Sequence, residues 1–190
     1  INGRSREGLA SAAETLPGAV IAQGDMSQPR EAKRVVEQVL SSFFGIDILI
    51  CNVGSGSSVP PGDESYEEWQ QVFALNLWST TNAVEASWDA LAGSKGAIVC
   101  ISSICGHEVI PGAPVTYSAA KAALNAYVRG ISRPLGEQGI RINAVAPGKV
   151  ETLSVGQRRG TSEYQERLRS VPTGRFVMPE EVVDVVMFLA

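Results

Sequence analysis

The sequence Tyr117-Ser118-Ala119-Ala120-Lys121 lies near the start of a long segment, residues 115–138, that is expected to be helical. In a helix Tyr117 and Lys121 stand on one face, so an ammonium can lie beside a phenol. Two unit charges about 4 Å apart interact by roughly 4 kcal/mol at an effective dielectric near 20. That energy would move a phenol pKa from about 10 to near neutrality. Tyr117 is therefore a candidate acid or base near pH 7.

Two hydroxyls precede this segment, because Ser102 ends the apolar run 96–102 and Ser103 follows it. Either serine is a candidate for holding a substrate oxygen.

Apolar runs of strand length alternate with segments of helical period along the whole chain. The expected strands are 19–24, 46–51, 96–102 and 140–146. The expected helices are 5–15, 29–43 with Ser27 as its N-cap, 65–91, 115–138, 162–170 and 179–190. This alternation predicts an α/β fold with a doubly wound, Rossmann-like parallel sheet and ligands at the carboxyl ends of its strands.

Composition limits the class of protein. The chain has 190 residues and is 44% hydrophobic, which is enough for one domain, 1–190, with a buried core. A net charge of −4 and the lack of a basic run argue against nucleic-acid binding. No apolar run approaches the roughly 20 residues that span a bilayer. We therefore expect a cytoplasmic protein with a small-molecule substrate and no membrane partner.

Cysteine and histidine give no sign of a metal site. Cys51, Cys100 and Cys105 form no metal-type or Cys-x-x-Cys pattern, and we expect reduced core residues. His107 is the only histidine, and a polar loop role is expected for it.

Several motifs in order resemble one family. They are Ala74-Leu75-Asn76-Leu77, Ser103 with Ile104-Cys105-Gly106, Tyr117 with Lys121, Arg141 to Gly148, and Gly174-Arg175-Phe176 with Pro179-Glu180-Glu181. Over its whole length the chain resembles the single-domain short-chain dehydrogenases/reductases, among them the 3-oxoacyl-carrier-protein reductases. The resemblance implies a catalytic set of Asn76, Ser103, Tyr117 and Lys121, in which Asn76 holds a water linked to Lys121. The family's spacing to Tyr117 and the following Ile104-Cys105-Gly106 favour Ser103, which leaves Ser102 as a strand-end hydrogen-bonding group. Asn76 could instead be a satisfied polar residue in a packed helix.

The resemblance also implies a nicotinamide cofactor site. Its residues would be Gly3, Arg4, Ser5, Asp25, Met26, Asn52, Val53, Gly54, Tyr117, Lys121, Pro147, Gly148, Val150 and Thr152. Cys51 replaces an asparagine that usually braces the central strands. Asp25 and Met26 would contact adenine, or alternatively form an ordinary turn before a helix.

Arg4 favours NADP over NAD as the cofactor. NAD-binding members of this fold carry an acid at the end of the second strand, but that position appears here as Gly3, followed by Arg4. A guanidinium can pair a 2′-phosphate in a bidentate manner. The alternative is that Arg4 is a solvated charge.

The family's glycine-rich phosphate turn is not found in this chain. Gly54-Ser55-Gly56 begins like one but runs into Pro60-Pro61 rather than a helix. We therefore expect a fragment that lacks the first strand, which lies mid-sheet in the family, and the last strand. Such a fragment alone should bind NADPH poorly and expose sheet edges.

The function implied is NADP-dependent hydride transfer between nicotinamide and a ketone/secondary alcohol pair, such as a 3-oxoacyl thioester, a sugar or a steroid-like alcohol. The long helices 65–91 and 115–138 are where the family builds homodimers and homotetramers. Two alternatives are a noncatalytic binding or regulatory relative and a Ser/Lys hydrolase with Ser103 as nucleophile. The hydrolase is disfavoured because it leaves Tyr117 without a role.

Overall fold

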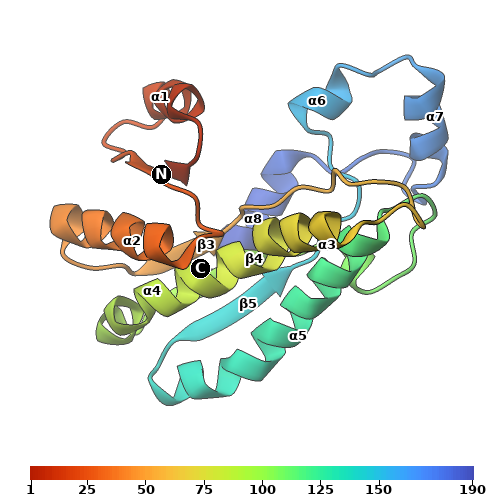
Figure 1. The fold of residues 1–190 in the computed structure, drawn as a ribbon. Coiled ribbons are helices and arrows are strands. Elements are labelled where there is room, and N and C mark those ends of the chain that lie inside the picture. Colours follow the sequence, from red (N-terminus) through yellow and green to blue (C-terminus); the bar gives the residue numbers. More distant parts are fainter.

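The computed structural model describes residues 1–190 as strands alternating with helices (Figure 1). The strands are β1 (Asn2–Gly3), β2 (Ala22–Gln23), β3 (Ile48–Cys51), β4 (Ala97–Ile101) and β5 (Arg141–Val145). The α-helices are α1 (Arg6–Glu14), α2 (Pro29–Phe43), α3 (Tyr66–Phe73), α4 (Ser79–Ser94), α5 (Val115–Glu137), α6 (Leu153–Gly156), α7 (Ser162–Arg169) and α8 (Pro179–Leu189). Every strand pair is parallel, which confirms the predicted α/β class.

The strands form two separate sheets, β1–β2 and β3–β4–β5. In the larger sheet Cys51 lies opposite Cys100, and Ala97 lies opposite Arg141. The outer edge of β2 is covered, because Gln38 and Arg34 of α2 donate to the carbonyls of Ile21 and Gln23 at 2.9 and 2.7 Å. The edges of β1, β3 and β5 have no such cover. The split between the two sheets lies between β1 and β3, where we expected the sheet to lack a strand.

Helices α4 and α5 pack against the larger sheet, and α8 lies behind it in Figure 1. The core forms between these layers. Its fully buried members include Val84, Leu91, Ile98, Leu124, Leu135 and Ile140. None of the helices is both long and apolar enough to cross a membrane.

The predicted helix 65–91 forms, but its hydrogen-bonding pattern changes in the middle. Ser65 caps it by accepting from the Glu68 amide at 3.2 Å, but a π-helical turn, η1 (Ala74–Trp78), separates α3 from α4. The second helix then continues to Ser94. A π turn holds one extra residue per turn, which changes the direction of the side chains it carries.

The strands are shorter than predicted, and one cap differs. The expected strand 19–24 pairs only at Ala22–Gln23. Gln28, not Ser27, is the N-cap of α2, and Pro29 opens the helix. The Ser27 amide instead donates to the Asp25 carboxylate at 2.9 Å, so an Asx turn takes the place that we had assigned to the cap.

Candidate active site

The loops after β3, β4 and β5 meet at the carboxyl edge of the larger sheet. The amide of Ser102, after β4, donates to the carbonyl of Val145 at 2.7 Å. The Ile104 amide donates to the carbonyl of Pro147, after β5, at 3.0 Å. A short 3₁₀ turn, η2 (Ile104–Gly106), then carries the chain away with Ser103 as its N-cap. The parallel order of the strands thus brings Ser103 and Pro147 to one edge.

Tyr117 and Lys121 lie on the first turns of α5, close to this edge. The Lys121 Nζ atom is 5.8 Å from the centre of the Tyr117 ring and donates to the carbonyl of Ile101 at 2.8 Å. Only 4% of Lys121 is exposed. Burial lowers the pKa of Lys121 to about 8 because the charged form loses hydration.

The expected fall in the Tyr117 pKa is wrong for this structure. Burial raises the pKa of Tyr117, and the hydrogen-bonded Ser103 hydroxyl opposes that rise only in part. The Lys121 ammonium is directed at the Ile101 carbonyl rather than held against the phenol oxygen. The simple charge-pair argument omitted burial, which acts against both charged forms. Tyr117 is therefore kept as a neutral phenol, a proton donor.

Asn76 lies in the π turn and is almost fully buried. Its Oδ1 atom accepts from the Ser55 amide, and its Nδ2 atom donates to the carbonyls of Ser55 and Val72, each at 3.0 Å. A Cβ added to Gly54 would lie 2.8 Å from the Asn76 Oδ1 atom and 3.2 Å from the Lys121 Nζ atom. The loop after β3 therefore approaches both side chains closely, and only glycine fits at position 54 without a shift.

Ser102 and Ser103 have different surroundings. Ser102 Oγ donates to the Oδ1 atom of buried Asn125 at 2.6 Å, whereas Ser103 Oγ accepts from the Cys105 amide at 3.2 Å and lies by the Tyr117 phenol. Asn125 also donates to the carbonyl of Gly106 at 3.3 Å. Ser102 thus takes part in a buried hydrogen-bond network. Through Asn125, this network joins the residues on both sides of Ser103 to α5.

Sequence reasoning did not find Asn125. A signal was present, because Asn125 stands four residues after Lys121 and so shares its helix face. A Cβ on Gly106 would come within 2.7 Å of the Asn125 Nδ2 atom and of the Lys121 carbonyl carbon. The turn after Ser103 therefore depends on glycine for its contact with α5.

Replacing Ser102 with Ala should lower the free energy of unfolding by about 1–3 kcal/mol, because the buried Asn125 oxygen loses its partner. Ser87 is the matched control. Its hydroxyl is equally buried but has no hydrogen-bond partner, so Ser87→Ala should be nearly neutral. Urea unfolding of the two variants measures the difference. Equal effects would show that the Ser102–Asn125 bond contributes nothing.

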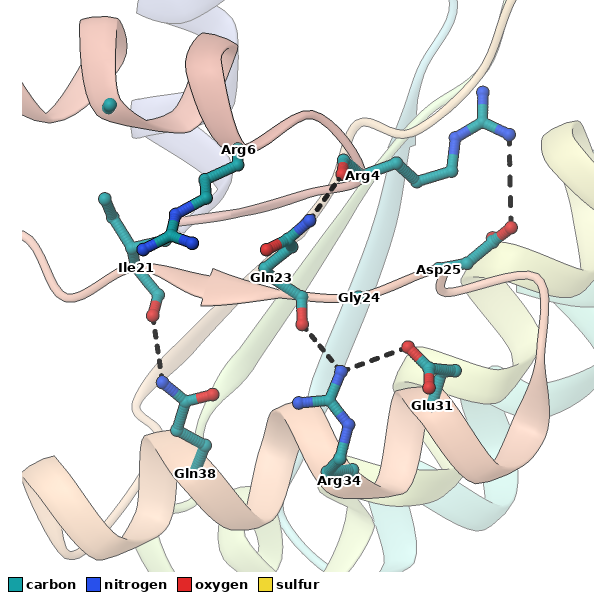
Figure 2. Close-up of a pocket in the computed structure, with 10 residues that line it drawn as sticks. Arg4, Arg6, Ile21, Gln23, Gly24, Asp25, Glu31, Arg34 and Gln38 are labelled. Atoms are coloured by element: carbon teal, nitrogen blue, oxygen red, sulfur yellow. Dashed lines mark hydrogen bonds and ion pairs between the residues drawn. The ribbon is translucent and has the colours of Figure 1, made fainter.

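Two of the residues predicted to bind the adenosine half, Arg4 and Asp25, line an open cavity of about 840 Å³ between α1, β2 and α2. Figure 2 shows Arg4 extended toward Asp25, with 3.9 Å between the Arg4 Nη1 and Asp25 Oδ2 atoms. Arg34, on the opposite wall, is held by Glu31 at 3.0 Å and by the Gln23 carbonyl. Arg4 is two-thirds exposed at its side chain and accessible to an anion.

Three other predicted cofactor residues have structural partners. Ser5 caps α1 by accepting from the Gly8 amide at 3.1 Å. The Met26 carbonyl accepts from Asn82 of α4 at 2.9 Å. Gly3 ends β1 and packs near Leu9. The Asp25–Met26 segment is therefore a turn, and it also borders the cavity through Asp25.

The remaining predicted cofactor residues lie in the loops after β3 and β5. Asn52 and Val53 are exposed after β3. Val150 forms a parallel bridge with Val177, and Thr152 is the N-cap of α6, with its hydroxyl 3.1 Å from that of Ser154. A Cβ added to Gly148 would meet no other atom within 4 Å. These residues thus follow strands of the larger sheet, whereas Arg4 and Asp25 follow the strands of the smaller sheet.

The three cysteines are free thiols. Cys51 and Cys100 are buried on neighbouring strands, and the hydrogen bond with Cys100, together with burial, raises the pKa of Cys51. Cys51 is therefore an uncharged packing group at the end of β3.

A parallel α/β fold with a hydroxyl, a phenol and an ammonium at the carboxyl edge of its sheet defines the class of Rossmann-like oxidoreductases. A family model described as enoyl-(acyl carrier protein) reductase matches residues 1–190. The chain belongs to this family, within the short-chain dehydrogenases/reductases.

Individual relatives agree with this assignment. A glucose 1-dehydrogenase of Gluconobacter oxydans is 32% identical, over 100% of this chain and 74% of the relative. A 3-oxoacyl-[acyl-carrier-protein] reductase of Chlamydia trachomatis is 32% identical, over 100% of this chain and 77% of the relative. A crystal structure titled gox2181 superposes with a TM-score of 0.92 at 26% identity, covering 100% of this chain and 77% of that one. The chain is thus similar to oxidoreductases named for different substrates.

Proposed function

We propose that this protein is an NADP-dependent reductase that transfers hydride between nicotinamide and a ketone/secondary alcohol pair. The observation that carries the proposal is the grouping of the Ser103 hydroxyl, the neutral Tyr117 phenol and buried Lys121 at one sheet edge. Bound NADPH supplies the hydride. The chain supplies a proton donor and a hydroxyl for the substrate oxygen.

In reduction, Ser103 orients the carbonyl oxygen and Tyr117 donates its phenolic proton to that oxygen as the carbonyl carbon gains hydride. Tyr117 is protonated near pH 7, but burial raises its pKa, so transfer of the proton depends on groups that stabilise the phenolate, among them the Ser103 hydroxyl. Lys121 lies close enough to stabilise the phenolate that remains, through its position 5.8 Å from the ring centre. Asn76 joins the loop after β3 to this group through Ser55 and Gly54. In our proposal it also holds a water that links Lys121 to solvent.

NADP is the proposed cofactor because Arg4 presents an accessible guanidinium beside the 840 Å³ cavity. Asp25 and Met26 would adjoin the adenine, with Gly3 and Ser5 beside Arg4. Asn52, Val53, Gly54, Pro147, Gly148, Val150 and Thr152 would adjoin the nicotinamide half. The substrate proposed is a 3-oxoacyl thioester, a sugar or a steroid-like alcohol, consistent with the range of the relatives' names.

The cofactor proposal predicts a lower KM for NADPH than for NADH in the natural polypeptide that contains this chain. Arg4→Ala should raise the NADPH KM by about tenfold or more, because a charge-assisted hydrogen bond contributes about 1.5–3 kcal/mol. Arg34→Ala is the matched control in the same cavity, because Glu31 and Gln23 already hold that guanidinium. A lower KM for NADH than for NADPH would overturn the assignment.

We also propose that α3, α4 and α5 form the contacts of a homodimer or homotetramer. Tyr66 of α3 and Trp78 of the π turn between α3 and α4 are exposed large side chains, which favours burial by a second copy.

A further inference from the structure

Glu151 is a buried carboxylate with two partners, and the proposed chemistry does not use it. Its side chain is 6% exposed. One oxygen accepts from the Arg159 Nε atom at 2.6 Å, and the other accepts from the Tyr164 hydroxyl at 2.9 Å. Arg159 keeps 65% of its side chain in solvent. A buried charge thus depends on a partner that reaches it from the surface.

These contacts close the segment 149–177 on itself. The Glu151 amide donates to the Val177 carbonyl at 2.8 Å, and the Val177 amide donates to the Lys149 carbonyl at 2.9 Å. Tyr164 packs edge-on against the buried ring of Phe176 with 5.0 Å between ring centres. Figure 1 shows the result, with α6 and α7 projecting together from the body of the molecule.

Glu151 also stands directly between Val150 and Thr152, the two residues proposed to adjoin the nicotinamide. Thr152 begins α6, and Arg159 follows that helix. The Glu151–Arg159 pair therefore fixes both ends of residues 152–159.

We propose that Glu151 is a positioning residue, which through Arg159 and Tyr164 holds residues 152–161 as a closed cover beside the nicotinamide. This proposal rests on the proposed reductase function for its place beside the cofactor. Loss of Arg159 leaves a buried carboxylate without its cation, which opens the segment because the charge must reach water.

The chain offers a matched control in the adjacent residue. Arg158 also pairs with an acid, Glu163, at 3.3 Å, but both side chains of that pair are more than half exposed. An exposed pair contributes little. Arg158→Ala therefore removes a charge and an ion pair from the same segment without exposing a buried carboxylate.

Hydrogen exchange of the natural polypeptide tests the proposal without an activity assay. In Arg159→Ala, the amides of residues 152–161 should exchange about tenfold faster, while α5 keeps its protection. Arg158→Ala should leave both unchanged within about twofold. Glu151→Gln leaves no buried charge, so it should raise exchange less than Arg159→Ala does. Arg159→Lys should restore part of the protection because it returns a cation.

Steady-state kinetics give the second readout. Arg159→Ala should raise the KM for NADPH by about fivefold, with a smaller change in kcat, because the cover adjoins the cofactor. Equal exchange in the Arg158 and Arg159 variants would overturn the proposal, as would loss of protection spread evenly over α5. A wild-type protein without reductase activity would refute the proposed function, while the exchange comparison would still decide whether Glu151 holds the segment.

Discussion

Replacing Tyr117 with Phe should lower the rate of ketone reduction by roughly 10²–10⁴-fold, the usual contribution of a positioned general acid. Phenylalanine keeps the ring but has no proton to donate. NADPH binding should persist, because Lys121 and Arg4 are unchanged. Stopped-flow measurement of NADPH oxidation, with a parallel fluorescence titration of NADPH, gives both quantities.

Tyr127 provides the control on the same helix. Burial is the main factor that raises its pKa, to about 12, yet it packs against the core rather than at the sheet edge. Tyr127→Phe should therefore leave reduction nearly unchanged. A Tyr117→Phe variant that retained most of its ketone reduction would contradict the proposed role. An ester hydrolase using Ser103 would instead keep much of its esterase rate in the variant.

Replacing Lys121 with Met should reduce activity by about 10²-fold or more and also remove a pH dependence of stability. The folded-state pKa of Lys121 is lowered to about 8 from 10.5. Below pH 8 both states are protonated, and the folded state carries the full cost of the buried charge. Between about pH 8 and 10.5 the unfolded state binds more protons, so wild-type stability rises with pH.

The difference in unfolding free energy between wild type and Lys121→Met should therefore shift in favour of wild type as pH rises through this window. The shift should approach about 3 kcal/mol, at about 1.36 kcal/mol per pKa unit. Denaturant unfolding at several pH values measures it. A constant difference from pH 7 to pH 10.5 would show that Lys121 is not desolvated in the folded state.

Much of the fold was predictable because its signals are local. Apolar runs such as 96–102 and the helical period of 115–138 do not depend on distant partners, and both elements form close to the expected bounds. The capping serine at position 65 is likewise a local signal. The parallel direction of the strands then follows from the alternation of strands with helices along the chain.

Features that depend on distant contacts were not predictable. The π turn around Asn76 forms where its side chain bonds the loop after β3. The expected strand 19–24 pairs with β1 only at Ala22–Gln23, and the carbonyls on its outer edge accept from α2 side chains rather than from another strand. The Ser102–Asn125 and Glu151–Arg159 hydrogen bonds join residues whose pairing local sequence does not specify, although Asn125 shares a helix face with Lys121.

The candidate site shows the same division. Tyr117, Lys121 and Ser103 came from spacing, and the structure places them together. The direction of the Tyr117 pKa shift was wrong because spacing carries no information on burial. A neutral phenol changes the emphasis of the mechanism toward proton donation, which suits reduction.

The most direct test of the central claim follows the hydride itself. NADPH carrying deuterium at the transferred position is incubated with a ketone and the natural polypeptide, and the alcohol is analysed by mass spectrometry. We predict one deuterium on the carbinol carbon with wild type and almost none with Tyr117→Phe. Binding of NADPH by the wild type without transfer of deuterium to any ketone of the proposed classes would contradict the account.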